Sequence, residues 1–131
     1  MTNQNGNSLF TNKELARYSR HVTIPEFGRE GQERLKRSKV LVIGTGGLGA
    51  PALQYLAAAG IGEIGIVDFD RVEDSNLQRQ VLFGTEDIGR PKTAVAKEKL
   101  QNLNPYVTIH IHETQLTSEN ALEIFQGYDI V

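Results

Sequence analysis

The sequence contains no cysteine among its 131 residues. Disulfides, thiolate zinc sites, thiol nucleophiles and thioester intermediates are therefore excluded for this chain. The sequence also lacks an apolar run long enough to cross a bilayer. Its first ten residues have neither the basic end nor the apolar centre of a signal peptide. With no export signal in the sequence, we expect a cytoplasmic protein.

An excess of positive charge is missing as well. A net charge of −2 and a pI near 5.9 provide no long-range attraction for nucleic acid or for an anionic membrane, so we expect neither as a partner. The hydrophobic share of 39% and the charged share of 23% are ordinary for a globular protein of one domain. We expect residues 1–10 to form a polar, disordered lead-in and residues 11–131 to form the domain.

The chain is organised around residues 39–49, in which an apolar strand runs into a glycine-rich turn and then into an apolar helix. This order is typical of the phosphate loop of a nucleotide-binding βαβ unit. Gly44 permits the tight turn, Gly46 lets the backbone approach a phosphate, and Gly49 lets helix and strand pack closely. The N-terminus of the helix then presents free N–H groups to an anion.

An acid follows this loop at the expected place. Asp68 ends the second expected strand nineteen residues after Gly49, where a carboxylate can bind the hydroxyls of a ribose. Together, the strand, the loop, the helix and the acid predict a nucleotide site. The alternative is a close-packed corner between a helix and a strand that binds no ligand.

Helix and strand patterns alternate along the chain and predict an α/β fold. Thr11 and Glu14 form a capping box that opens a helix with Leu15, Tyr18 and Val22 on one face. Further helices are expected at residues 28–37, 48–59, 91–103 and 117–126, and the helix at 91–103 has an apolar stripe of Ala96, Leu100 and Leu103. Strands are expected at residues 39–43, 64–68 and 107–112, and a further strand begins at residue 128. We therefore predict a Rossmann-like, doubly wound, mostly parallel sheet with N-terminal helices. Because the last strand is barely begun at Val131, we expect the front part of a longer protein.

Residues 69–89 connect the second strand to the next helix, and this connection is unusually long. Such connections commonly have two to six residues, and longer ones are usually functional or disordered. The segment is rich in hydrogen-bonding groups, but Leu77 and residues 81–83 need an apolar environment. We therefore predict an ordered, functional loop.

Lys92 is a cation in the first turn of a helix, where the helix dipole disfavours it by roughly 0.3–1 kcal/mol. An anion bound between the lysine and the helix end would explain this placement. The alternative is a lysine whose long stem simply reaches solvent.

Two further pairs of side chains can be interpreted either as functional residues or as ordinary surface residues. Arg17 and Arg20 project from one side of their helix and could be solvated surface arginines. His110 and His112 could share a metal ion, but no third ligand is evident nearby. We interpret the two histidines as the polar face of an edge strand.

Several strings of this sequence carry a resemblance to a known family. They are the glycine loop at 42–49, Asp68-x-Asp70, Ser75-Asn76-Leu77-x-Arg79-Gln80, Gly89-x-Pro91-Lys92, Arg17-Tyr18-x-Arg20, Gly31-Gln32-x-x-Leu35 and Asn104-Pro105. The chain resembles the ThiF/MoeB/HesA family, the adenylyltransferases related to ubiquitin-activating enzymes, over residues 15–131. Many enzymes share the glycine loop, whereas the S-N-L-x-R-Q string followed by G-x-P-K is highly specific.

The resemblance implies adenylation of a protein C-terminus. The C-terminal glycine carboxylate of a ubiquitin-like sulfur-carrier protein of the MoaD or ThiS type would attack the α-phosphate of MgATP. This gives a carrier acyl-adenylate and pyrophosphate, in molybdopterin or thiamine biosynthesis. The step needs no covalent enzyme intermediate, so the lack of cysteine does not exclude it.

The resemblance also assigns roles to residues. Asp68 would hold the ribose, and Asn76, Arg79 and Lys92 would contact the phosphates. Arg20 would enter the ATP site of a partner subunit, which favours a symmetric homodimer. The implied catalytic residues are Arg79, Lys92, Arg20 and Asp68, and the implied nucleotide contacts are Gly44, Gly46, Gly47, Gly49, Asp68, Asp70, Ser75, Asn76, Leu77, Gln78, Arg79 and Lys92.

Parts of the family pattern are missing from this sequence. The D-x-x-D-N segment whose aspartate binds Mg²⁺ would begin after Val131, and a four-cysteine zinc site would lie further on. Metal ligands cannot therefore be placed on this chain, and we expect residues 1–131 alone to be inactive. The open alternatives are a relative that adenylates a tRNA base or a small molecule, a nicotinamide dehydrogenase, and a non-catalytic nucleotide-binding subunit.

Overall fold

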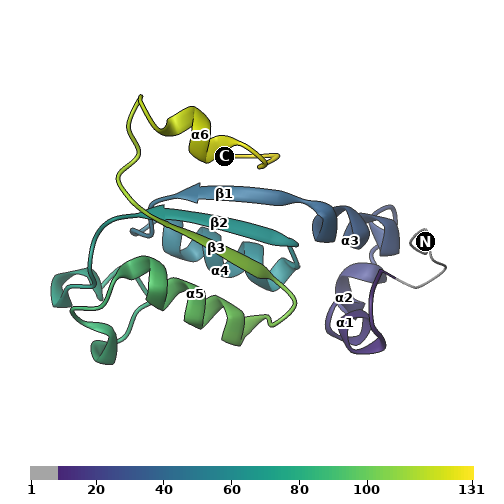
Figure 1. The fold of residues 1–131 in the computed structure, drawn as a ribbon. Coiled ribbons are helices and arrows are strands. Elements are labelled where there is room, and N and C mark those ends of the chain that lie inside the picture. Colours follow the sequence, from purple (N-terminus) through teal and green to yellow (C-terminus); the bar gives the residue numbers. More distant parts are fainter. Residues whose placement is uncertain (1–8) are drawn as a thin grey trace.

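The computed structural model describes residues 9–131, and Figure 1 shows their arrangement. The elements are α1 (Asn12–Arg17), α2 (Ser19–Val22), α3 (Gly28–Arg37), β1 (Lys39–Ile43), α4 (Gly49–Ala59), β2 (Glu63–Asp68), the 3₁₀ turns η1 (Asp74–Asn76) and η2 (Thr85–Asp87), α5 (Lys92–Leu103), β3 (Thr108–Glu113) and α6 (Ala121–Phe125). No helix among the described residues has both the length and the apolar character needed to cross a membrane.

The three strands form one parallel sheet in the order β1-β2-β3. Beyond β1, Ile130 makes an isolated parallel bridge to Val40, so the start of a fourth strand lies on the opposite side of β1 from β2. The chain therefore winds away from β1 in both directions, and the predicted doubly wound α/β fold is confirmed. The sheet is open.

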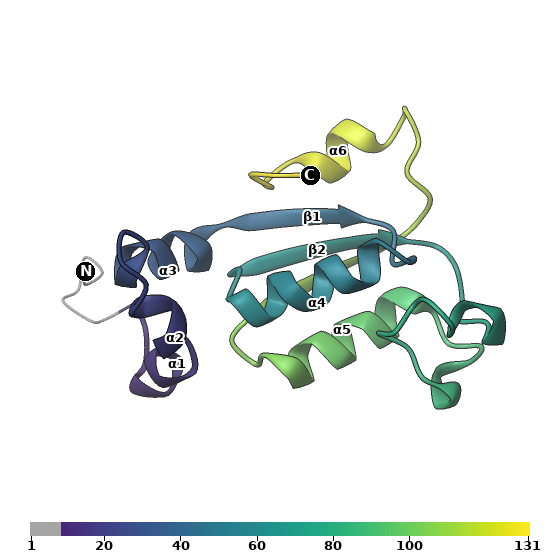
Figure 2. The same cartoon turned by 180° about the vertical axis from the view of Figure 1, so that it is seen from behind.

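Helices α4 and α5 cover one face of the sheet, and α6 lies over the other (Figures 1 and 2). The core lies between the sheet and the first of these layers. Its central side chains are Leu53 and Ala57 of α4, Ile64 and Ile66 of β2, Val95, Ala96 and Leu100 of α5, and Ile109 of β3. The alanine-rich sequence of α4 allows this helix to approach the sheet closely.

The N-terminal helix begins as predicted but ends earlier. Thr11 and Glu14 form the capping box. The single helix expected through Val22 is divided at Tyr18, whose backbone leaves helical geometry between α1 and α2. The Tyr18 ring is buried, and its hydroxyl accepts a 2.7 Å hydrogen bond from Asn104. This long-range contact fixes the turn and could not be deduced from local periodicity.

Three other features differ from the prediction. Leu103, expected on the buried stripe of α5, is 42% exposed, whereas Val95 of the same helix is fully buried. Helix α6 is shorter than residues 117–126, because Thr117 and Asn120 form a reciprocal hydrogen-bonded turn ahead of it. Residues 1–8 of the predicted lead-in lie outside the described residues, but Phe10 is buried beside Tyr18 and belongs to the folded domain.

Candidate functional site

The glycine loop lies where β1 ends, at the point where the sheet winds in opposite directions. Ligands of doubly wound folds bind at this position. Gly44 has a φ of +91°, which confirms the tight turn that only glycine adopts easily. A Cβ on Gly49 would overlap the carbonyl oxygen of Gly44, which confirms the close packing of helix on strand.

The middle glycines of the loop have a different environment. A Cβ built on Gly46 would have Gln80 Nε2 as its nearest neighbour at 3.9 Å, and one on Gly47 would meet Arg79 Cδ at 3.6 Å. Packing within the chain therefore does not require glycine at either position. Within residues 9–131 the N–H groups of Gly46 and Gly47 donate to no acceptor. An open surface with two free N–H groups is suited to an anion.

Asp68 is held in place by the loop that it faces. Its Oδ2 accepts hydrogen bonds from Thr45 N at 2.9 Å and from Thr45 Oγ1 at 2.6 Å, and its Oδ1 accepts one from Asp70 N at 2.9 Å. Burial by itself would raise the pKa of this carboxyl. The hydrogen bonds from Thr45 and Asp70 and the charge of Lys92 outweigh burial, so the pKa lies below its usual value. The carboxylate is therefore ionised, and Oδ1 keeps a lone pair for another donor.

Lys92 is the buried cation of this region. Its side chain is only 6% exposed, and its Nζ lies 4.0 Å from Asp70 Oδ2, beyond the length of a normal hydrogen bond. The alternative of a lysine whose stem simply reaches solvent is therefore wrong, and Lys92 belongs to the buried part of the domain. The bridge between Arg71 and Pro91 and the bond from Lys92 N to Asp70 O fix the start of α5 beside β2.

Arg79 and Gln80 lie next to the middle glycines of the loop. Arg79 is exposed, its aliphatic stem lies against Gly47, and its Nη1 donates to the Ser75 carbonyl at 3.1 Å. Gln80 is 4% exposed, and its buried Oε1 has no hydrogen-bond partner in the described chain. The sequence analysis did not assign a role to Gln80, although the residue closes the S-N-L-x-R-Q string.

The long connection is ordered, as predicted. Val72 and residues 82–83 are buried in the core, and Leu77 packs against it. Asn76 is buried and accepts a hydrogen bond from the Glu73 N–H at 3.0 Å, so its side-chain oxygen holds the turn η1 together. Ser75 and Gln78 are exposed.

Arg20, to which the resemblance assigns a catalytic role, lies away from the glycine loop. Arg20 is exposed on α2, beside the amino ends of the strands, whereas the glycine loop lies at their carboxyl ends (Figure 1). Arg20 therefore cannot reach the loop of its own chain. Arg17 has a structural contact instead, because its Nη1 donates to the Leu103 carbonyl at 2.8 Å.

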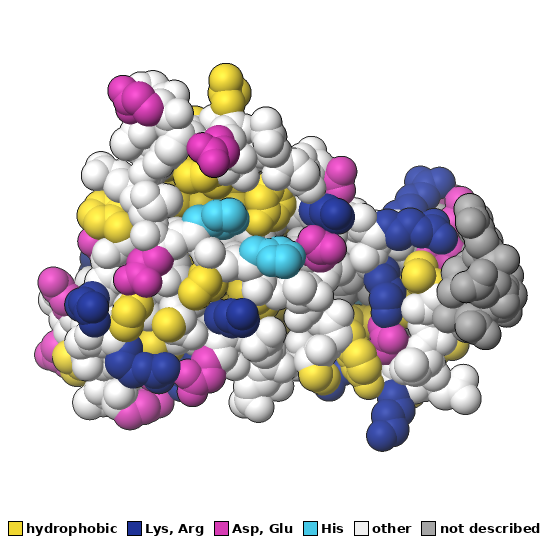
Figure 3. Space-filling view, in the orientation of Figure 1, with side chains coloured by type: hydrophobic (Ala, Val, Ile, Leu, Met, Phe, Trp, Pro, Cys, Tyr) yellow, Lys and Arg dark blue, Asp and Glu magenta, His cyan; other side chains and the backbone are white. Residues whose placement is uncertain are grey.

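The two strand histidines have polar partners on the face of the sheet opposite α4 and α5. His110 Nε2 lies 3.2 Å from a Glu63 oxygen, and His112 Nε2 lies 3.0 Å from the Tyr128 hydroxyl. Figure 3 shows histidine side chains beside apolar ones on this face. No group of three His, Asp or Glu side chains that could hold a metal occurs in the described part of the chain.

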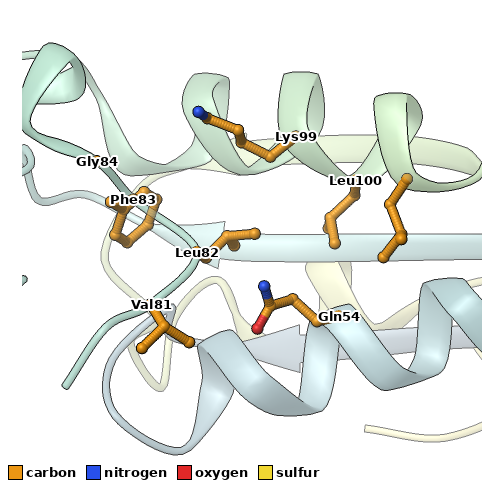
Figure 4. Close-up of a pocket in the computed structure, with 8 residues that line it drawn as sticks. Gln54, Val81, Leu82, Phe83, Gly84, Lys99 and Leu100 are labelled. Carbon is orange, nitrogen blue, oxygen red and sulfur yellow. The ribbon is translucent and has the colours of Figure 1, made fainter.

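A pocket of about 360 Å³ lies elsewhere, between α4 and α5. Figure 4 shows Gln54 and Leu100 on its two sides and residues 81–84 across one end. None of the residues around the glycine loop lines it, and we do not assign it to the same site.

The sequence profile described as the ThiF family matches residues 18–131. The chain belongs to the ThiF family. This membership confirms the resemblance found in the sequence.

Individual relatives support the same assignment. The chain is 58% identical to the sulfur carrier protein adenylyltransferase of Thermus thermophilus over 93% of its own length and 45% of that protein. It is 52% identical to a probable molybdopterin-synthase adenylyltransferase of Porphyra purpurea, over 95% of its own length and 32% of that protein. The chain thus spans less than half the length of these relatives.

The chain is also similar to a solved protein structure. The tRNA N6-threonylcarbamoyladenosine dehydratase TcdA of E. coli, in complex with ATP, matches 90% of this chain and 48% of its own with a TM-score of 0.83 and 26% identity. This similarity supports the Rossmann-like arrangement described above.

Proposed function

We propose that this chain carries the nucleotide-binding part of an ATP-dependent adenylyltransferase. Its substrate is the C-terminal glycine carboxylate of a ubiquitin-like sulfur-carrier protein, in molybdopterin or thiamine biosynthesis. The single observation that carries the proposal is the buried Lys92 beside an open glycine loop. A buried ammonium 4.0 Å from its nearest carboxylate oxygen gains most from an anion placed next to it.

The residues around the loop fit ATP better than a dinucleotide such as NAD. Asp68 is ionised, and its Oδ1 can accept a hydrogen bond from a ribose hydroxyl. Arg79 lies against Gly47, Lys92 is close enough to Asp68 to lower its pKa, and the N–H groups of Gly46 and Gly47 are free. Two cations beside the loop suit the charge of three phosphates.

In the proposed step, an oxygen of the carrier carboxylate attacks the α-phosphorus of ATP, a new P–O bond forms, and the bond to pyrophosphate breaks. Negative charge accumulates on the phosphoryl oxygens during this displacement. Arg79 and Lys92 neutralise that charge from fixed positions, and the glycine loop orients the α-phosphate. Mg²⁺ bound with ATP would screen the charge of the phosphates, and we assign none of the residues described here as its ligand.

The position of Arg20 supports a homodimeric enzyme. Because Arg20 lies at the end of the sheet away from its own glycine loop, it can serve a nucleotide site only on another molecule. One chain carries both Arg20 and the set of Asp68, Arg79 and Lys92. A symmetric dimer would therefore contain two equal sites, each completed by the partner's arginine.

ATP–pyrophosphate exchange by the full-length protein that contains this chain tests the proposal. We expect exchange that depends on an added sulfur carrier, tight binding of ATP or ADP by calorimetry, and no comparable binding of NAD. Residues 1–131 alone should bind nucleotide weakly and support no exchange. Tight NAD binding without ATP binding would disprove the adenylation proposal.

The similarity to the tRNA dehydratase favours a second candidate, adenylation of a tRNA base. Its identity of 26% is well below the 58% shared with the sulfur-carrier enzyme, which is why we place it second. Exchange that requires tRNA and not a carrier protein would support it.

A further inference from the structure

Gln80 is a buried glutamine whose side chain the fold leaves unpaired. It is only 4% exposed, and within residues 9–131 its amide has no hydrogen-bond partner at either end. Buried polar groups are almost always hydrogen-bonded, because leaving one unpaired lowers the stability of the fold. The Gln80 amide therefore needs an explanation other than packing, and a bound group that pairs with it would provide one.

The position of this amide is nevertheless fixed by the main chain. The Gln80 N–H donates to the Asn76 carbonyl at 2.9 Å, and the Gln80 carbonyl accepts a hydrogen bond from Phe83 N at 3.2 Å. Asn76 in turn accepts a hydrogen bond from Glu73 N at 3.0 Å, and Phe83 is buried in the core. The backbone of Gln80 is thus held on both sides, which keeps the amide in the fixed position that a binding group requires.

The donor end of the amide lies at the glycine loop. Nε2 of Gln80 is 3.9 Å from the position of a Cβ built on Gly46. Apart from the residues next to Gly46, no other heavy atom of the described chain lies within 4 Å of that position. The N–H groups of Gly46 and Gly47 are also free within residues 9–131. Three unpaired donors therefore lie at this loop, and such a group suits an anionic oxygen.

The order of contacts along the loop indicates which oxygen this is. Asp68, which the proposed function assigns to the ribose, is bonded to Thr45. The next residue, Gly46, adjoins the Gln80 amide, and the residue after it adjoins Arg79. Successive loop residues are only about 3.8 Å apart. The phosphate attached to the ribose therefore belongs beside Gly46, and the outer phosphates belong nearer Arg79.

We propose that Gln80 donates a hydrogen bond from Nε2 to an oxygen of the α-phosphate of the bound nucleotide, the phosphate that the carrier carboxylate attacks. This inference rests on the proposed function and adds a residue to its site. Because the fold buries the amide without a partner, the phosphate meets a donor that is already desolvated. Hydrogen bonds to a charged oxygen are stronger than those between neutral groups, so this bond orients the α-phosphate as well as binding it.

Gln32 shows how a buried glutamine with a structural role differs. It has no exposed surface, its Nε2 donates to the Ala59 carbonyl at 2.8 Å, and its Oε1 lies 3.0 Å from His21 Nδ1. Both ends of this amide are paired within the fold. The two glutamines therefore form a matched pair for mutation to methionine, which is similar in size and shape but has no amide.

Urea unfolding of the full-length protein without added nucleotide gives the first measurement. Gln32→Met removes two hydrogen bonds and should lower the urea midpoint. Gln80→Met removes none within the described chain and should leave the midpoint unchanged or raise it. A midpoint lowered by Gln80→Met as much as by Gln32→Met would show that the Gln80 amide is structural and would overturn the proposal.

Calorimetry with AMP, ATP and adenosine gives the second measurement. Gln80→Met should weaken the binding of AMP and of ATP by the same factor, roughly 10- to 100-fold, the range for one hydrogen bond to a charged group. Its binding of adenosine, which has no phosphate, should equal that of the wild type. Gln101→Met, at an exposed position of α5, is the control and should bind all three normally.

Two results of this calorimetry would overturn the role of Gln80. One is wild-type affinity of Gln80→Met for AMP, and the other is an equal loss of affinity for adenosine. In both cases the wild type still binds ATP, so the proposed function stands. A wild-type protein that binds neither ATP nor AMP would instead disprove the proposed function itself, on which the role of Gln80 depends.

Discussion

Thr45 gives both its backbone N–H and its hydroxyl to the same oxygen of Asp68, at 2.9 and 2.6 Å. The glycine loop at the end of β1 is thereby joined to the acid at the end of β2. Thr45 has no exposed surface, so solvent does not compete for these bonds. The pair fixes the orientation of a carboxylate that must stay ionised to accept hydrogen bonds from a ribose.

Replacing Thr45 with valine keeps the shape and the backbone donor but removes the hydroxyl. The pKa of Asp68 should rise, because the strongest of the bonds that oppose burial is lost. Carbon-detected NMR titration of the Asp68 carboxyl measures this directly. Thr93→Val is the matched control, since Thr93 is equally buried but its hydroxyl has no partner in the described chain. An unchanged Asp68 pKa in Thr45→Val would contradict this role.

The same pair predicts a pH dependence of stability. The folded-state pKa of Asp68 lies below the usual value of 3.8, so its ionised form stabilises the fold at pH values above 3.8. This contribution should be lost as the pH falls through the lowered folded-state pKa. Urea unfolding between neutral pH and pH 2 measures it, and Thr45→Val should show a smaller loss over the acid range than the wild type.

Arg79→Ala and Lys92→Ala should each slow carrier-dependent pyrophosphate exchange roughly 100-fold or more, the scale for one preorganised charge contact. Their effects on folding should differ. Arg79 is exposed, whereas Lys92 is buried, so Lys92→Met is the better variant for keeping the packing of its stem. Lys97→Ala, on the same helix α5, is the control and should exchange normally. Wild-type rates in Arg79→Ala and Lys92→Met would refute the assigned roles.

Arg20→Ala and Arg79→Ala should complement each other when mixed. In a heterodimer of the two variants, one site contains the intact Arg79 of one chain and the intact Arg20 of the other. Part of the exchange activity should therefore return, measured against each variant alone after subunit mixing. Full heterodimer formation without recovery would mean that Arg20 does not act in the partner's site.

Asn104 should be a major determinant of stability. Asn104 has no exposed surface; its Nδ2 donates to the Tyr18 hydroxyl and the Ala57 carbonyl, and its Oδ1 accepts from Tyr106 N at 3.1 Å. Asn104→Ala leaves several buried groups unpaired and should lower the free energy of unfolding by about 2–4 kcal/mol, whereas Tyr18→Phe removes one bond and should cost about 1 kcal/mol. Urea titration compares the two. Equal decreases in the free energy of unfolding of the two variants would show that only the bond to the Tyr18 hydroxyl matters.

The sequence alone predicted the parallel, doubly wound sheet around the glycine loop and, to within one residue, the limits of α3, α4 and α5. These features depend on contacts between near neighbours: alternating apolar residues, the Thr11 capping box, and glycines at Gly44 and Gly60 with positive φ. The sequence also indicated the family, because the motifs that contain Arg79 and Lys92 are short continuous segments of the chain. Such patterns can be recognised without knowing the contacts between residues that are distant in the sequence.

Only the tertiary structure decided the rest, because contacts distant in sequence set it. Tyr18 divides the first helix through its bond to Asn104. Lys92 becomes buried because the bridge between Pro91 and Arg71 fixes the start of α5 against the sheet. The double donation of Thr45 to Asp68 joins residues 23 positions apart. The separation of Arg20 from its own glycine loop follows from the length of α4, which places the two at opposite ends of one rigid helix.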